Sequence, residues 1–159
     1  MKNMGEYQAF LAAVRSLTGL DMLVPDETGL VTVRVEDKFN MSLQYIEDGG
    51  RILCFVEVVQ LPVDAPKAVY RDLLAGGLFG SETAGGYFAL EPESETVIYN
   101  YFFDGGAAAR DPEGFASTLE NILQVCELWD ERIRSGMEDA SGVQPAPMHG
   151  PYSHGAFFA

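Results

Sequence analysis

Hydrophobic residues recur at helical spacing near both ends of the chain. The first stripe comprises Tyr7, Phe10, Leu11, Val14 and Leu17. It predicts an amphipathic helix over residues 6–18 that stops at Gly19. The second stripe comprises Phe115, Leu119, Ile122, Cys126, Trp129 and Ile133. It predicts a long helix that begins near Asp111-Pro112-Glu113.

Between these helices the pattern changes to alternation of apolar and polar residues, which is typical of half-buried strands. Residues 31–35 alternate Val with Thr and Arg, and residues 39–45 alternate large apolar with polar side chains. Residues 51–59 are apolar on both faces, as expected of a central strand that is covered on each side. Asp48-Gly49-Gly50 favours a tight turn before this strand. The three strands predict an antiparallel meander.

A short helix and a second hairpin are predicted before the last helix. Pro66 and Gly76-Gly77 bracket the apolar segment 68–74, which we expect to be the short helix. Residues 87–90 and 97–103 then read as two strands of a hairpin. The order α-β-β-β-α-β-β-α predicts an α+β fold, in which an antiparallel twisted sheet has its helices packed mainly on one face.

The composition changes after the last helical stripe. From Ser135 onward Gly, Pro, Ser, Ala and His dominate. We therefore predict a single α+β domain over residues 1–134 and a Pro/Gly-rich C-terminal tail over residues 135–159. We hypothesise that the aromatic residues of the tail occupy a groove on the same or a neighbouring chain, with incidental packing as the alternative. These residues are Tyr152, Phe157 and Phe158.

The charge balance narrows the classes of partner. The chain has 24 acidic and 10 basic residues, a formal net charge of -14, but its 47% hydrophobic residues suffice for a core. The charge therefore belongs to the surface, and an anionic surface repels nucleic-acid phosphates and anionic lipid headgroups. Because the sequence shows neither a signal peptide nor a membrane-spanning run, we expect no membrane insertion and a cytoplasmic location.

The sequence offers no constellation for catalysis or metal binding. Its two histidines, His149 and His154, both lie in the predicted tail. Cys54 and Cys126 stand in apolar stretches without a CxxC pattern, so we expect buried thiols rather than a redox pair. The glycine-rich segments lack the spacing of a phosphate-binding loop. We therefore expect no enzyme and no cofactor.

Residues 73–90 carry a family resemblance. This segment reads LLAGGLFGSETAGGYFAL. It is similar to the class I (CesT/Tir-type) chaperones of bacterial type III secretion, which have a Leu-Leu pair, a Gly-Gly pair and a later Leu there, although Gly77 stands near where an Asn is common. The resemblance covers about residues 6–134. It implies an acidic homodimer, formed around Val69–Leu90, that holds an effector before export while a largely extended effector segment wraps around it.

The resemblance implies a type III secretion chaperone that binds the N-terminal segment of an effector and keeps it soluble. The chain also has more aromatic residues than one core needs, so we expect some of them to meet a second chain. The predicted partner-binding residues are Phe10, Val14, Phe39, Met41, Leu43, Tyr45, Tyr99 and Tyr101. The predicted dimer-interface residues are Val69, Tyr70, Leu73, Leu74, Tyr87 and Phe88.

A second interpretation is a regulatory or small-ligand-binding domain of the same fold, unconnected with secretion. A closed apolar pocket would favour this second interpretation, whereas open grooves would favour a protein partner.

Overall fold

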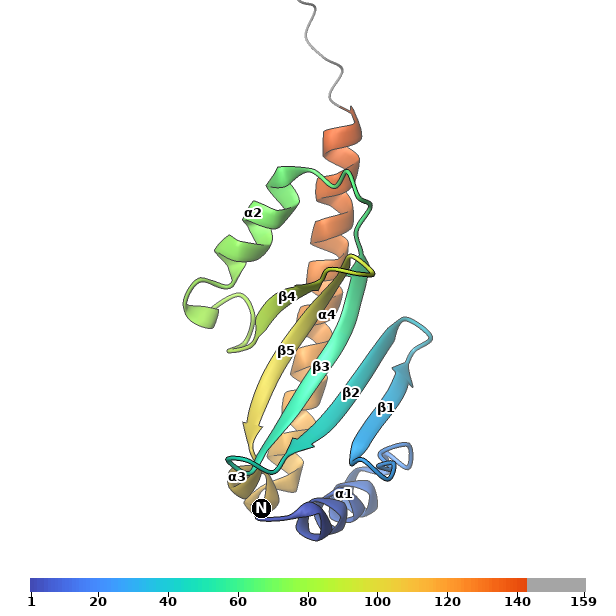
Figure 1. Ribbon diagram of the computed structural model, residues 1–159, viewed down its shortest axis with the longest axis vertical. Helices are drawn as coiled ribbons and strands as arrows, with labels where there is room; N and C mark the ends of the chain where they lie inside the picture. Colours follow the sequence, from blue (N-terminus) through green and yellow to red (C-terminus); the bar gives the residue numbers. More distant parts are fainter. Residues whose placement is uncertain (143–159) are drawn as a thin grey trace, which may run out of the picture.

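The computed structural model describes residues 1–142 (Figure 1). The elements in chain order are α1 (Met4–Thr18), β1 (Leu30–Val35), β2 (Phe39–Ile46), β3 (Arg51–Gln60), α2 (Lys67–Gly76), the 3-10 turn η1 (Leu78–Gly80), β4 (Tyr87–Glu91), β5 (Thr96–Asp104), α3 (Gly105–Arg110) and α4 (Pro112–Gly142). The predicted order is confirmed, with η1 and α3 added to it. The tail aromatics, His149 and His154 lie outside the described residues.

The strands form one antiparallel sheet in the order β1-β2-β3-β5-β4. Pairing of β3 with β5 joins the predicted meander to the predicted hairpin. The helices lie on one face, where α4 runs along the sheet and α1 lies near the end of β1 (Figure 1). The α+β prediction is thus confirmed, and β1 and β4 are left as the two sheet edges.

Helix ends follow their capping chemistry. The Asn3 side chain accepts a hydrogen bond from the Glu6 backbone N–H at 3.0 Å, and Gly19 ends α1 in a left-handed conformation. The side chain of Asp104 caps α3 in the same way by accepting from the Ala107 N–H. Two glycines begin α3, which is why the hydrophobic pattern did not predict this helix.

The prediction that β3 is covered on both faces is wrong. Ile52, Cys54 and Val56 point into the core, whereas Leu53 and Phe55 lie on the opposite face and are only half-buried. The helices of the described residues cover a single face of the sheet, so the second apolar face of β3 is left open.

The core takes up most of the aromatic residues. Tyr7 stacks on Tyr45 with ring centroids 5.2 Å apart. The ring centroid of Phe115 of α4 lies 4.9 Å from that of Phe10 and 4.5 Å from that of Phe103. Two helices packed on one sheet face therefore bury these rings within a single chain, and the expectation that an aromatic excess must meet a second chain is wrong for them.

Helix α4 continues to Gly142, beyond the predicted domain boundary at residue 134. Near this end Gly136 packs against α2, where an added Cβ would stand 3.4 Å from Val69. Further back, the buried carboxylate of Asp130 pairs with Arg134 at 2.8 Å and with Lys38 of the β1–β2 turn at 3.5 Å. The division into a domain and a separate tail stays a prediction.

Candidate partner-binding surfaces

Most of the predicted partner-binding residues belong to the core. Tyr101 is half-buried, and the buried ones are Phe10, Val14, Phe39, Met41, Leu43, Tyr45 and Tyr99. Their positions on α1, β2 and β5 face the helical layer, because alternate strand residues point to opposite faces of a sheet. The prediction that these seven side chains are exposed for docking is therefore wrong.

The predicted dimer-interface residues lie together on α2 and β4. Val69 is buried against α4, and the half-buried ones are Tyr70, Leu73 and Phe88. Leu74 is 80% exposed and Tyr87 46% exposed. Their role in a dimer stays a prediction, but the structure gives this region an apolar exterior.

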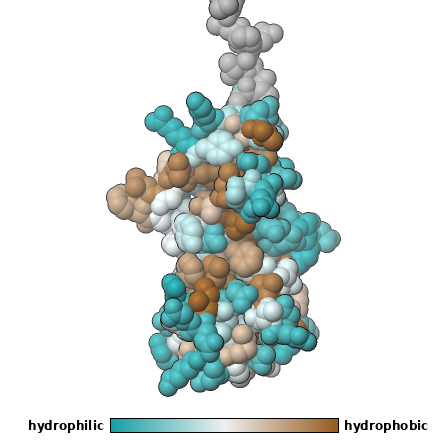
Figure 2. Space-filling model, viewed as in Figure 1, coloured by the Kyte–Doolittle hydropathy of each residue, from teal (hydrophilic) through white to brown (hydrophobic). Residues whose placement is uncertain are grey.

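The apolar exterior extends beyond the predicted set. We define the α2–β4 surface by its exposed apolar residues, Leu74, Leu78, Phe79, Tyr87 and Leu90. Figure 2 shows hydrophobic residues gathered over α2 and over the middle of the neighbouring sheet. Leu78, Phe79 and Leu90 were not predicted. The sequence does contain a sign that Leu78 and Phe79 are exposed, because a Leu-Phe pair with glycines on both sides is poorly placed to join a core.

A hollow opens between α2 and β4. Its volume is about 160 Å³. The lining residues are Tyr70, Leu73, Leu74, Phe88, Ala89, Leu90 and Val97. None of these side chains is charged, so the hollow suits an apolar group.

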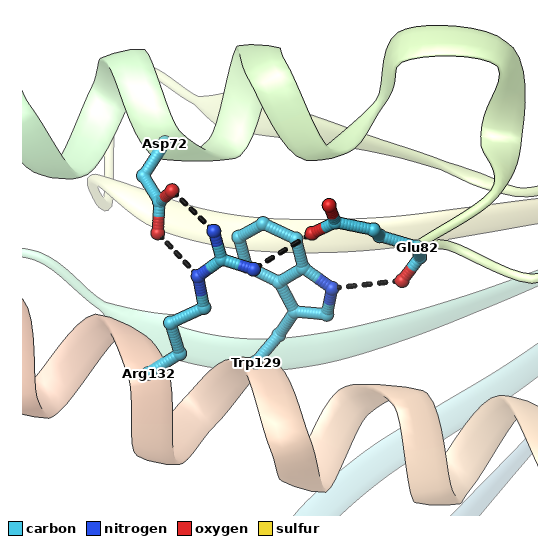
Figure 3. Close-up of polar contacts among 4 residues, drawn as sticks. All are labelled: Asp72, Glu82, Trp129 and Arg132. Atoms are coloured by element: carbon cyan, nitrogen blue, oxygen red, sulfur yellow. Dashed lines mark hydrogen bonds and ion pairs between the residues drawn. The ribbon is translucent and has the colours of Figure 1, made fainter.

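Arg132 of α4 anchors both flanks of this region (Figure 3). Its guanidinium donates two hydrogen bonds to Asp72 of α2 and one, at 2.7 Å, to the Glu82 carboxylate. These carboxylates raise the pKa of Arg132. Because all three side chains are partly exposed, each ion pair contributes little stability and serves mainly to position α2 and the loop before β4.

Trp129 supplies the apolar part of the same anchor. Its indole N–H donates to the Glu82 carbonyl at 3.1 Å, and its ring lies beneath the Arg132 guanidinium and 4.9 Å from the Phe88 ring (Figure 3). Gly76 crosses the indole so closely that an added Cβ would stand 2.1 Å from the ring. The end of α2 therefore requires glycine at this position in order to pack on Trp129.

The uncovered side of the sheet forms a second apolar surface. We define the open sheet face by Leu53, Phe55, Tyr87, Ile98 and Phe102, which are exposed or half-buried. Tyr87 and Phe102 lie with their ring centroids 6.5 Å apart, and Arg51 lies 4.8 Å from the centre of the Phe102 ring. Further exposed apolar side chains, Leu17, Met22 and Val24, lie at the end of α1 and in the loop that leads to the edge strand β1.

The thiols are unsuited to nucleophilic chemistry. Burial raises the pKa of Cys54 to about 12 and also raises the pKa of Cys126. Both groups therefore remain protonated at neutral pH, and a protonated thiol is a poor nucleophile. Within the part of the chain that the structure describes, no three His, Cys, Asp or Glu side chains are grouped in a way that could hold a metal ion.

We expect the protein to lose stability in alkali. Burial raises the pKa values of Cys54, Cys126, Tyr7 and Tyr99 in the folded state, whereas the unfolded chain releases its thiol protons near pH 9 and its phenol protons near pH 10. Above these values the unfolded state binds fewer protons, so the free energy of unfolding falls as pH rises, by up to about 1.4 kcal/mol per pH unit for each group. Urea unfolding at pH 8 and pH 10.5 measures this. Cys54→Ala should show a smaller drop, and an equal drop would contradict the assignment to the thiol.

A family model supplies the deciding comparison. The model of the Tir chaperone protein (CesT) family matches residues 10–130. Residues 10–130 include both apolar surfaces. They also include Asp72 and Glu82, the two residues that Arg132 binds. The chain belongs to this family. No curated protein matches its sequence at a significant level.

Solved structures agree with the fold of the CesT family member. A chain of the ExsC–ExsE complex has a TM-score of 0.69 and 20% identity, over 82% of this chain and 96% of that chain. A chain of the HopA1–SchA chaperone–effector complex has a TM-score of 0.62 and 19% identity, over 84% of this chain and 98% of that one. A chain of the heterodimeric ExoU–SpcU complex of the Pseudomonas aeruginosa type III secretion system has a TM-score of 0.57 and 17% identity, over 83% and 98% of the two chains.

The helices of this family member are those of a packed domain. Among residues 1–142, none combines the length and the apolar character needed to cross a membrane.

Proposed function

We propose that the protein is a cytoplasmic, non-catalytic type III secretion chaperone that works as a homodimer and binds the N-terminal segment of a secreted effector. The observation that supports this most directly is the presence of two exposed apolar surfaces on one small acidic chain. The α2–β4 surface suits a second copy, and the open sheet face suits an effector segment. Large exposed apolar surfaces on a folded chain are typical of protein-binding sites.

An extended effector segment fits the second surface on physical grounds. The open sheet face offers apolar side chains for shallow contacts. The separate sheet edge at β1 offers unpaired backbone groups to an added strand, with the exposed Leu17, Met22 and Val24 near it. The net charge of -14 keeps the chaperone soluble and favours an effector segment with basic residues between its apolar ones. Two of the similar structures are described as a chaperone–effector complex and a type III secretion complex, which is consistent with this kind of partner.

The small-ligand alternative has less support. The hollow between α2 and β4 is apolar but opens at the surface, and its volume of about 160 Å³ is below the range of about 300–1,000 Å³ that is usual for drug-sized ligands.

Gentle purification of the tagged protein from cells that express secretion genes tests the proposal. Light scattering and mass spectrometry would give the identity and ratio of bound chains. We expect two copies of this chain with one copy of a larger secreted polypeptide. Recovery of a partner-free monomer under these conditions would overturn the proposed function.

A charge on the open sheet face should weaken effector binding. Phe102→Asp places a carboxylate where an apolar ring is 38% exposed, and we expect the dissociation constant for the effector's N-terminal segment to rise about tenfold. Isothermal titration with that segment measures the effect. Val63→Asp is the matched control, because Val63 is exposed at a turn away from both surfaces. Equal affinity of Phe102→Asp and wild type would remove this face from the binding site.

A further inference from the structure

Phe79 projects from the loop between α2 and β4. Its side chain is 94% exposed, so its ring contacts almost nothing in its own chain. Its backbone has φ 60° and ψ 7°, a left-handed conformation that is unfavourable for a bulky residue. An exposed aromatic ring on strained backbone gives the monomer no packing energy, which points to a role outside the monomer.

The loop that presents Phe79 is firmly attached to the domain. The Gly85 N–H donates to the Gly80 carbonyl at 3.0 Å and closes the loop on itself. The buried Thr83 hydroxyl donates to the Gly86 carbonyl at 2.6 Å, and Tyr99 donates to the Thr83 carbonyl at 2.7 Å. Together with the bond from Trp129 to the Glu82 carbonyl, these contacts fix the loop at several points. The exposure of Phe79 is therefore built into the fold, because the loop backbone that carries it is held in place before any partner arrives.

The α2–β4 hollow is on the same surface and has the size of an aromatic ring. A buried apolar cavity of about 150 Å³ in another protein binds benzene, and the hollow here measures about 160 Å³. The ring of Phe79 is exposed, so it does not fill the hollow of its own chain. One surface thus carries both a projecting apolar ring and an unfilled apolar recess.

We propose that Phe79 of each chain inserts into the α2–β4 hollow of a second copy in a symmetric homodimer. A two-fold interface brings the same patch of both chains together, so one ring and one recess per chain give two identical contacts. Two acidic copies repel each other, and an uncharged surface is where that repulsion is weakest. The inference rests on the homodimer of the proposed function and adds its anchor residue and receiving site.

Two variants test the Phe79 ring and the α2–β4 hollow independently. Phe79→Gly removes the ring and also relieves the left-handed strain, so the monomer should unfold at an equal or higher temperature while the dimer weakens. Leu90→Trp fills the recess with a larger side chain and leaves Phe79 intact. We expect each variant homodimer to lose both contacts and to dissociate about 100-fold more readily than wild type, at about tenfold for each contact.

Mixing the two variants tests the pairing. The heterodimer regains one contact, because Phe79 of the Leu90→Trp chain meets the intact hollow of the Phe79→Gly chain. Its dissociation constant, measured by sedimentation equilibrium with one chain labelled, should be about tenfold lower than that of either variant homodimer. A heterodimer no tighter than the tighter of the two homodimers would overturn the pairing. A wild-type chain that is monomeric at every concentration would instead overturn the proposed homodimer.

Discussion

Replacing Trp129 by alanine should lower the free energy of unfolding by about 3–5 kcal/mol, the usual cost of removing a large buried aromatic side chain. Trp129 is 3% exposed and contacts α2 at Gly76, β4 through Phe88 and the intervening loop through the Glu82 carbonyl. Its loss would leave a cavity where these elements meet. Urea unfolding followed by circular dichroism measures the change in the midpoint and in the free energy.

Two further variants separate the contributions of Trp129 to the free energy of unfolding. Trp129→Phe keeps an aromatic ring but removes the hydrogen bond to the Glu82 carbonyl, so we expect a smaller cost of about 1–2 kcal/mol. Leu128→Ala changes an exposed neighbour on the same helix, and its effect should stay within about 0.5 kcal/mol. An alanine variant at position 129 that loses less than about 1 kcal/mol would show that α2 is held by other contacts.

Replacing Trp129 should also weaken the proposed homodimer. Arg132 and Trp129 together hold both α2 and the loop that presents Phe79 (Figure 3). Both halves of the α2–β4 surface therefore depend on the same turn of α4. We therefore expect a change at Trp129 to weaken the dimer as well as the fold.

The order and type of the main elements could be predicted because each has its own period. The stripe from Phe115 to Ile133 repeats at helical spacing, and residues 31–35 alternate as a strand. Helix α3 could not be predicted in this way, since Gly105-Gly106 resembles a turn and its formation depends on a single cap at Asp104. Its six residues contain no periodic apolar stripe to reveal them.

The exposure of individual residues was much harder to predict than the elements. Alternation along β2 indicates which residues share a face, but not whether helices or solvent cover that face. The pattern predicts Met41 and Leu43 on a docking surface, whereas the structure buries both in the core. Among the residues that the family resemblance places at a dimer interface, Leu74 and Tyr87 are exposed and Val69 is buried, and their role in a dimer stays a prediction. Phe79 was missed because its exposure depends on the backbone conformation of a short loop.

Replacing Leu74 by aspartate should convert the dimer to a monomer at micromolar concentrations. Leu74 is 80% exposed on α2 and lines the edge of the hollow, so a carboxylate there would lose its water when two copies associate. Each copy would lose about 2 kcal/mol of binding free energy, and symmetry doubles the loss to about 4 kcal/mol, or about a thousandfold in the dissociation constant. Sedimentation equilibrium of the purified chain measures this directly.

The matched control for Leu74→Asp is Val63→Asp, which adds the same charge at an exposed apolar residue, 94% exposed, between β3 and α2 and outside the α2–β4 surface. The control should dimerise like wild type, apart from a small effect of the added charge that salt would screen. Dimerisation of Leu74→Asp at wild-type strength would move the interface away from α2, and the open sheet face would then be the remaining large apolar surface able to hold a second copy. Weakened dimerisation with intact binding of the effector segment would instead show that the two surfaces work independently, because a charge on α2 leaves Leu53 and Phe102 of the open sheet face unchanged.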